Sequence, residues 1–366
     1  MGKNSNNKNK SRINKMKTQA EPVELTNENK TFEPRVEIKG YEFNDASKVF
    51  LYDVFIKLIV TFFVIYFISS IAELREVSYF EFVRSNLLIG IMLTLVSPII
   101  LCLIFFGYSK MNKINIKSEI KPKSKVNIVM ILICLLISVV CLFMMGGVFN
   151  CFDYLFYKSG YVVSGELAFE INNIWKLLLS ILTMAILPAI FEELVYRGII
   201  LKGMLSKFKP WVAIIISALF FTLMHGSLDQ TLFQFMLGVI LCFVFYKTQN
   251  IIYPILIHFF NNTLVLVLNY LNSTILIGNP ENTTYVIVSI LLFIGGLGLI
   301  LGAGYLINRY YAIKPIEESK SLKNNEKLGF LGLLNNTTKS EKVLFWGSLI
   351  MAGAVWLINT ATGFVS

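Results

Sequence analysis

Hydrophobic residues gather in long runs that short polar segments separate, and several of these runs reach about 20 residues. A helix of that length, at about 1.5 Å per residue, crosses the roughly 30 Å hydrocarbon core of a bilayer. The runs do not alternate in the way that the strands of a membrane β-barrel would. We therefore expect an all-α, polytopic membrane helical bundle of about eight or nine transmembrane helices. The expected spans are 51–73, 87–108, 128–149, 174–196, 211–226, 231–247, 251–271, 284–307 and 343–364.

Polar segments divide the chain into four regions. Residues 1–48 are rich in Asn, Lys and Glu without an apolar period, which is typical of a disordered, basic tail. Residues 49–150 hold the N-terminal transmembrane helices, and 284–366 hold the C-terminal ones. The segment 174–271 carries the polar groups discussed below. The count of eight or nine spans turns on the short connection within it at 226–231, which is compatible with a re-entrant turn.

Composition agrees with a membrane protein, since 55% of the residues are hydrophobic and only 15% are charged, with a mean hydropathy of +0.65. The net charge of +10 could indicate nucleic acid, but its distribution follows alternate loops. Residues 1–50 carry ten Lys/Arg, and the loops 109–127, 197–210 and 308–342 carry six, four and seven. This asymmetry predicts a plasma-membrane, multi-pass protein with a cytoplasmic N-terminus. We therefore expect the basic loops to interact with the lipid bilayer and expect no nucleic acid as a partner.

Ionisable groups lie inside three of the apolar runs, where they are costly and mark functional sites. The chain has only two histidines, His225 and His258, and both belong to such runs. Glu192 is 16 residues before Phe208 in the polar turn at 206–210, and His225 is 17 residues after it. In an antiparallel hairpin both side chains therefore lie about 24 Å above the turn.

A second hairpin is expected to turn near Gln249-Asn250. His258 lies eight residues beyond that turn, about 12 Å up, and Asn262 follows one helical turn later on the same face. If this turn sits at the membrane surface, Glu192, His225, His258 and Asn262 can meet in the cytoplasmic half of the bilayer.

The two adjacent carboxylates are expected to act differently. Glu193 and Arg197 stand at i and i+4, which predicts an ion pair within one helix. Glu192 then faces elsewhere in low-dielectric surroundings, where a carboxylate is suited to general-base chemistry. Pro188 and Pro254 precede Glu192 and His258 by four residues and favour kinks.

The three motifs are Glu192-Glu193-x-x-x-Arg197, Phe221-x-x-x-His225 and His258-x-x-x-Asn262. In them the chain resembles the CAAX-processing and bacteriocin-immunity (CPBP, or Abi) family of intramembrane proteases. The eukaryotic branch of that family is the Ras-converting type of CAAX prenyl endopeptidase. The resemblance makes residues 174–271 a CPBP-like protease core. Tyr196 is a departure, because many members have Phe before the Arg.

The resemblance implies an endopeptidase in which Glu192, helped by His225, activates a water molecule. His258 and Asn262 would stabilise the oxyanion of the tetrahedral intermediate. Glu193 and Arg197 would hold the site in shape, and Phe221 would form a wall of it. The implied substrate is a membrane-associated peptide or protein.

Metal dependence has two open answers. Glu192, His225 and His258 form a ligand set of the kind that holds catalytic Zn²⁺, and the family is often labelled a metalloprotease. The chain lacks the His-Glu-x-x-His helix motif, and a metal-free site driven by the glutamate is the alternative. The cofactor is therefore either Zn²⁺ or none.

Two other functions are compatible with charged groups in the membrane. An ion-coupled transporter would use them as a proton or ion path, although the inverted repeats of such proteins are not visible in the sequence. A non-catalytic bacteriocin self-immunity protein would bind a toxin or its receptor and would not need Glu192 for chemistry.

Overall fold

The computed structural model describes residues 40–157, 169–226, 228–271, 283–310, 329 and 337–362. All elements within these ranges are helical, and no strand occurs among them, which confirms the all-α prediction. The elements are α2 (Phe43–Leu74), α3 (Tyr79–Ser85), α4 (Leu87–Met111), α5 (Ile116–Ile120), α6 (Ile128–Tyr157), α7 (Ile174–Ser180), η1 (Ile181–Ile186), α8 (Leu187–Val195), η2 (Tyr196–Leu201), α9 (Lys202–Lys207), α10 (Pro210–Leu223), α11 (Leu228–Thr248), α12 (Ile252–Tyr270), α13 (Thr283–Tyr310) and α15 (Lys339–Thr362).

Eight helices in the described ranges are long and apolar enough to cross a membrane, so the protein is a multi-pass membrane protein. The helix at the fifth expected span, α10, has only 14 residues. At about 1.5 Å per residue it covers roughly 21 Å, less than the hydrocarbon core. The polytopic bundle of eight or nine helices is thus confirmed, with eight helices of spanning length.

The first helix begins earlier than the sequence pattern suggests. Residues 1–39 of the expected tail lie outside the described residues, but α2 starts at Phe43, before the expected boundary at residue 48. Glu42 and Asp45 form a capping box, in which the Glu42 backbone N–H donates to Asp45 Oδ2 at 2.8 Å. The Phe43 ring packs edge-on against Phe208, with centroids 5.2 Å apart. Capping and packing together extend the helix into a polar stretch.

The continuous helical run Ile174–Lys207 contains two π-helical segments, η1 and η2, with α8 between them. π-Helical turns are rare in proteins, and those that do occur are often found at functional sites. Pro188 lies at the start of α8 and has no N–H to donate to the carbonyl of Met184. That carbonyl instead accepts a hydrogen bond at 3.1 Å from Nδ2 of Asn262 in α12.

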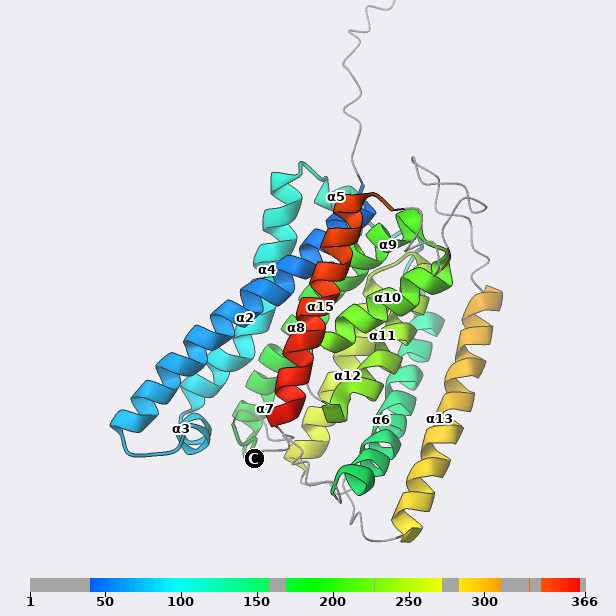
Figure 1. Ribbon diagram of the computed structural model, residues 1–366. Helices are drawn as coiled ribbons and strands as arrows, with labels where there is room; N and C mark the ends of the chain where they lie inside the picture. Colours follow the sequence, from blue (N-terminus) through cyan, green and yellow to red (C-terminus); the bar gives the residue numbers. More distant parts are fainter. Residues whose placement is uncertain are drawn as a thin grey trace, which may run out of the picture. The chain divides into compact units, whose positions relative to one another are not determined.

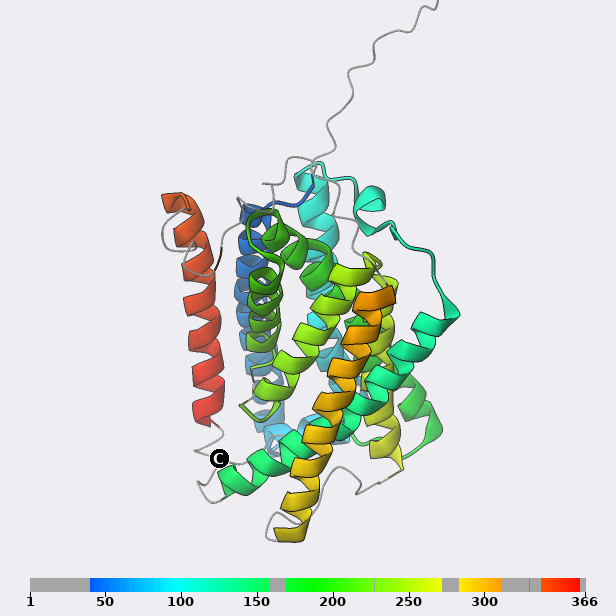
Figure 2. The ribbon, with the colours of Figure 1, turned by 90° about the vertical axis from the view of Figure 1, so that its right-hand side faces the viewer.

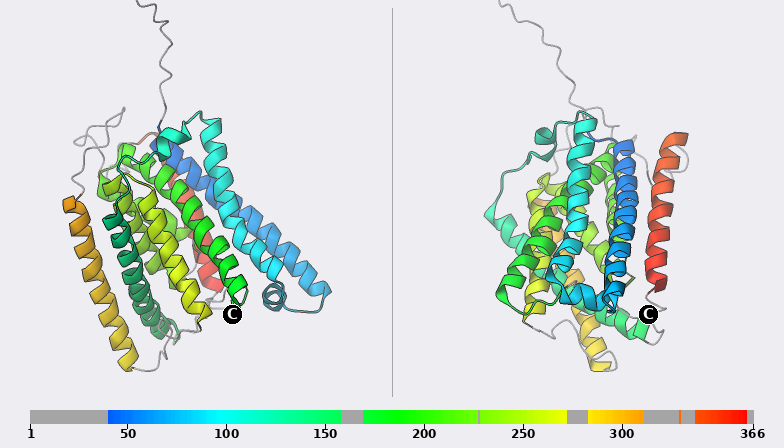
Figure 3. Two further views of the ribbon diagram at one scale, coloured as in Figure 1. Left: turned by 180° about the vertical axis from the view of Figure 1, so that it is seen from behind. Right: turned by 90° about the vertical axis from the view of Figure 1, so that its left-hand side faces the viewer.

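The membrane helices pack around several apolar clusters, and two of these are the largest. The first cluster involves α2, α4 and α8 to α10, and the second involves α6, α11, α12 and α13. α15 packs along α2, although 264 residues of the chain lie between the end of α2 at Leu74 and the start of α15 at Lys339 (Figure 1). Figure 2 shows α13 beside α6, and Figure 3 shows α4 running along α2.

Candidate active site

A buried ion pair connects α8 to η2. Arg197 Nη1 lies 2.8 Å from Glu193 Oε1, and both side chains are completely buried. Arg197 Nη2 also donates to the carbonyl of Gly238 in α11, and the guanidinium lies 4.6 Å from the centroid of the Phe221 ring. A buried ion pair needs such additional contacts to offset its desolvation. The structure thus contains the pair that the i, i+4 spacing predicts, and this pair ties three helices together.

His258 of α12 lies between the two adjacent carboxylates. Its Nδ1 is 2.9 Å from Glu193 Oε1, and its Nε2 is 3.9 Å from Glu192 Oε2. Glu193 is already paired with Arg197, so its carboxylate accepts the Nδ1 hydrogen. This contact orients the ring and directs Nε2 toward Glu192, as a carboxylate does for the histidine of a catalytic triad.

Glu192 has a carboxylate oxygen without a hydrogen-bond partner. Its Oε2 atom is buried and unpartnered, although the side chain as a whole retains 14% of its exposure. Burying such an oxygen without a donor is unfavourable, so the arrangement favours a water or substrate group beside it. Glu192 is therefore placed to accept a proton or a hydrogen bond from a reactant.

His225 follows α10 and is fixed by its own helix. Its Nδ1 is 2.9 Å from the carbonyl oxygen of Phe221, and its ring packs on the Phe221 ring with centroids 4.6 Å apart. A carbonyl oxygen can only accept, so Nδ1 carries the hydrogen and Nε2 of the neutral ring is a proton acceptor. His225 lies within electrostatic range of Glu192 and His258.

The loop that follows His225 is held by α15. Gly226 has a φ of +65°, and a Cβ there would come within 2.6 Å of the side-chain nitrogen of Asn359. Trp356 Nε1 donates to Thr231 Oγ1 at 2.9 Å, just inside α11. Two contacts from α15 therefore lie on either side of the connection between α10 and α11.

Asn262 lies on the edge of this group of residues. Its Nδ2 donates to the Met184 carbonyl, and its Oδ1 is 3.5 Å from Nδ2 of the buried Asn261. Among the described residues, the side chain of Asn262 makes no hydrogen bond with the side chain of Glu192 or His258. The structure thus brings Glu192, Glu193, Arg197, Phe221, His225 and His258 together and places Asn262 against η1.

A second buried cluster adjoins the site and was not singled out from the sequence. Asp53 of α2, fully buried, accepts a hydrogen bond at 2.8 Å from the Tyr196 hydroxyl and pairs with Lys57 at 3.0 Å. Tyr196 and His225 are within electrostatic range of Glu192 and Lys57, respectively. An Asp and a Lys four residues apart inside an apolar run are the signal that could have revealed them. The hydroxyl of Tyr196 thus has a specific partner, which a Phe at this position would leave without its donor.

The candidate metal ligands do not form a metal site. In the described part of the chain, no group of three or more His, Cys, Asp or Glu side chains is placed to hold a metal ion. Glu192, His225 and His258 therefore do not fit a preformed Zn²⁺ site.

Comparison with known proteins gives a family match to the region that carries these residues and a match to one curated relative. The family described as "Type II CAAX prenyl endopeptidase Rce1-like" matches residues 173–264. "Putative membrane peptidase YdiL" of Bacillus subtilis (strain 168) is 30% identical over 90 residues. These residues are 25% of this chain and 37% of that relative, so the similarity spans little more than a third of the relative's length. No solved structure matches the chain.

Proposed function

We propose that this chain is an intramembrane endopeptidase, because residues 173–264 match the Rce1-like, type II CAAX prenyl endopeptidase family. Its substrates are membrane-associated peptides or proteins, which reach a site buried among membrane helices through the bilayer. The basic loops favour the plasma membrane and a cytoplasmic N-terminus. The site then opens toward the cytoplasm.

The observation that carries the proposal is the unpartnered Oε2 atom of Glu192 beside His258. A buried carboxylate oxygen without a donor is suited to holding a water molecule and accepting its proton. The neighbouring Glu193 also has an unpartnered oxygen, Oε2. It is not the base we propose, because its Oε1 atom pairs with both Arg197 and His258 and its side chain is completely buried, whereas the Glu192 side chain keeps 14% of its exposure. Glu192 is thus the general base of the proposed reaction.

His225 assists Glu192 in this proposal. The carbonyl of Phe221 holds its Nδ1 hydrogen, which leaves Nε2 able to accept a proton or a hydrogen bond from the attacking water. The water oxygen attacks the scissile carbonyl as its proton passes to Glu192. The tetrahedral intermediate then collapses with cleavage of the C–N bond, and Glu192 returns the proton to the leaving amine.

The oxyanion that forms is stabilised by His258 and Asn262. For His258 this requires a hydrogen on Nε2, and the Glu193 carboxylate at Nδ1 stabilises the doubly protonated ring that supplies it. Asn262 donates one amide hydrogen to Met184 and has a second one for the oxyanion. Arg197 and Phe221 support this arrangement by holding Glu193 and both rings.

The test compares cells that make the wild type, Glu192→Gln or Glu73→Gln at equal membrane abundance. Glu73 is an exposed residue at the end of α2, so its substitution removes a carboxylate outside the site. Mass spectrometry maps new peptide termini in the membrane and secreted fractions. We expect termini that occur with the wild type and Glu73→Gln but not with Glu192→Gln.

Other outcomes separate the alternatives. Identical termini in all three strains, together with a phenotype that survives Glu192→Gln, would favour a non-catalytic immunity protein. Loss of ion or solute flux in Glu192→Gln, without a change in termini, would favour an ion-coupled transporter.

A further inference from the structure

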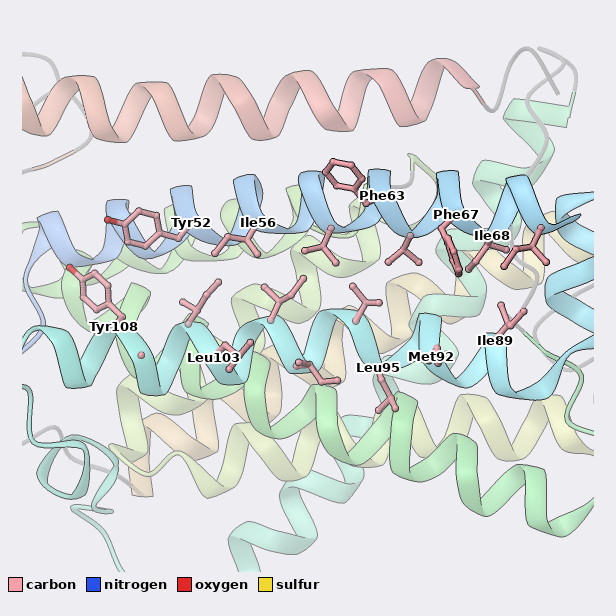
Figure 4. Close-up of a pocket in the computed structure, with 18 of the residues that line it drawn as sticks. Tyr52, Ile56, Phe63, Phe67, Ile68, Ile89, Met92, Leu95, Leu103 and Tyr108 are labelled. Carbon is pink, nitrogen blue, oxygen red and sulfur yellow. The ribbon is translucent and has the colours of Figure 1, made fainter. Parts of the chain in front are cut away.

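A long apolar groove lies between α2 and α4, away from the candidate active site. Its volume is about 940 Å³, near the upper end of the roughly 300–1,000 Å³ typical of ligand sites. Figure 4 shows side chains of both helices facing one another along it, with Tyr52 and Tyr108 at one end and Ile68 and Ile89 at the other. None of the candidate catalytic residues lines it. The groove is therefore a separate feature of the fold.

The groove follows the membrane-spanning parts of both helices. From Tyr52 to Ile71 it extends over 19 residues of α2, or about 28 Å at 1.5 Å per residue. This length is close to the roughly 30 Å thickness of the hydrocarbon core. Its lining is almost wholly alkyl and aromatic, so its surface matches acyl chains along its whole length.

Two lysines lie just beyond the tyrosine end of the groove, on the same helix faces as the residues that line it. Lys48 is one helical turn before Tyr52, and Lys110 is two turns after Leu103, so each lies on the face that lines the groove. Neither amine has an ion-pair or hydrogen-bond partner within the described ranges. By contrast, Lys57, Lys202 and Lys207 are each paired with a carboxylate.

The tyrosine end also offers a hydroxyl. Tyr108 donates its own hydroxyl hydrogen to Asp45 at 2.6 Å, whereas the Tyr52 hydroxyl makes no hydrogen bond in the described part of the chain. Tyr52 is 43% exposed and lies beside the Tyr108 ring, with centroids 6.2 Å apart. A donor and two amines thus lie at one end of the groove.

The opposite end carries charges of both signs. Glu73, Glu76 and Glu81 are exposed there, on and between the ends of α2 and α3, together with Arg75 and Arg84. An anionic group is therefore favoured at the tyrosine end over this end.

We propose that this groove binds an anionic phospholipid. Its phosphate lies between Lys48 and Lys110 within reach of the Tyr52 hydroxyl, and its acyl chains extend along the groove from the tyrosine end. The proposal does not rest on the proposed protease function, because it involves none of the residues assigned to catalysis.

The experiment uses the purified full-length protein in detergent. Native mass spectrometry measures retention of phosphatidylglycerol and of phosphatidylcholine with the same acyl chains. We expect the wild type to retain phosphatidylglycerol preferentially. Each lysine near an anionic lipid contributes about 1 kcal/mol to the binding free energy. The double variant Lys48→Gln with Lys110→Gln should therefore bind phosphatidylglycerol roughly tenfold or more weakly. Lys117→Gln with Lys121→Gln removes the same charge from exposed positions outside the groove and serves as the control.

The acyl-chain part is tested by filling the groove. Gly107 lines it, and a Cβ at this position meets no atom within 4 Å, so Gly107→Phe can extend into the groove without a clash at Cβ. This variant should lose both lipids, and Leu103→Trp is a second filling variant in case the first one fails to fold. Gly298→Phe on α13 is the matched control, because Gly298 is also exposed without a neighbour within 4 Å.

Three results would overturn the proposal. If the wild type and the lysine variant each retained phosphatidylglycerol and phosphatidylcholine equally, the proposed headgroup site would be ruled out. If both filling variants retained the two lipids as the wild type does, the proposed acyl-chain site would be ruled out. A dimer that the filling variants dissociate would assign the groove to a second copy of the chain.

Discussion

At the residue scale, Glu192 and Glu193 show how strongly one position on a helix changes the surroundings of a carboxylate. Successive residues point about 100° apart around a helix, so the two side chains face different neighbours. Glu193 is fully buried and pairs through Oε1 with Arg197 and His258, whereas Glu192 keeps 14% of its side-chain exposure and lies 3.9 Å from His258. Each carboxylate also has one unpartnered oxygen. The motif spacing predicts the Glu193–Arg197 pair. The contact of His258 with Glu193 depends on how α12 packs against α8 and could not be read from spacing.

Removal of Arg197 should be far more harmful than removal of a surface cation. Arg197→Met leaves Glu193 buried with only His258 beside it, and breaking such a pair costs about 3–5 kcal/mol. Unfolding by SDS in mixed micelles measures this cost. Lys202→Met is the control, because its partner Glu119 is partly exposed and such a pair is worth about 1 kcal/mol or less. Equal costs for the two variants would contradict the assignment.

The hydroxyl of Tyr196 should contribute to stability through Asp53. Tyr196→Phe deprives a fully buried carboxylate of a donor, which costs about 1–3 kcal/mol of unfolding free energy. In a background of Asp53→Leu and Lys57→Met the same substitution should cost less, because no carboxylate is left unsatisfied. An identical cost in both backgrounds would show that the hydrogen bond is not the source of the effect.

At the scale of elements, the helical run Ile174–Lys207 contains features that the apolar periodicity does not predict. Apolar periodicity predicts a helix over 174–196, and the structure has one. The π-helical segments η1 and η2 within this run leave no mark in the apolar periodicity. Pro188 lies at the junction of η1 and α8, near the expected kink, whereas Pro254 lies in the first turn of α12, where no intrahelical bond is lost.

Pro188 and Asn262 should be coupled energetically. Asn262→Ala leaves the Met184 carbonyl without its donor, at a cost of about 1–3 kcal/mol. Pro188→Ala restores a backbone N–H near that carbonyl, so the double variant should recover part of the stability that Asn262→Ala loses. Thermal unfolding of the four proteins measures the coupling. Additive effects would mean that the proline and the amide act independently.

At the scale of the whole molecule, length and hydropathy were enough to predict the class and the positions of nearly all of the membrane helices. The start of α2 at Phe43 was missed, because capping by Glu42 and packing against Phe208 outweigh a polar sequence. The lateral order of the helices was also beyond prediction. Asp53 and Tyr196 are 143 residues apart in the chain, and only the packing of α2 on η2 brings them together.

Chelation should leave the proposed cleavage intact. In the described ranges no group of three His, Cys, Asp or Glu side chains is placed to hold a metal ion, so activity is not expected to need Zn²⁺. The measurement is cleavage by the purified protein, on a substrate found by mapping termini, before and after treatment with 1,10-phenanthroline. A zinc protease in the same buffer controls for effective chelation. Loss of cleavage that added Zn²⁺ restores would instead establish a metalloprotease.

The contacts of α15 with the connection after His225 bear on the order in which the protein is built. Gly226 and Thr231, on either side of that connection, both meet residues of α15. During synthesis α15 leaves the ribosome after every other described helix, and it lies outside the family match at 173–264. A nascent chain that already holds all three motifs therefore still lacks the contacts that hold the connection after His225. We expect such a chain to be inert until α15 has been inserted, so that the membrane is spared cleavage by a half-made protease.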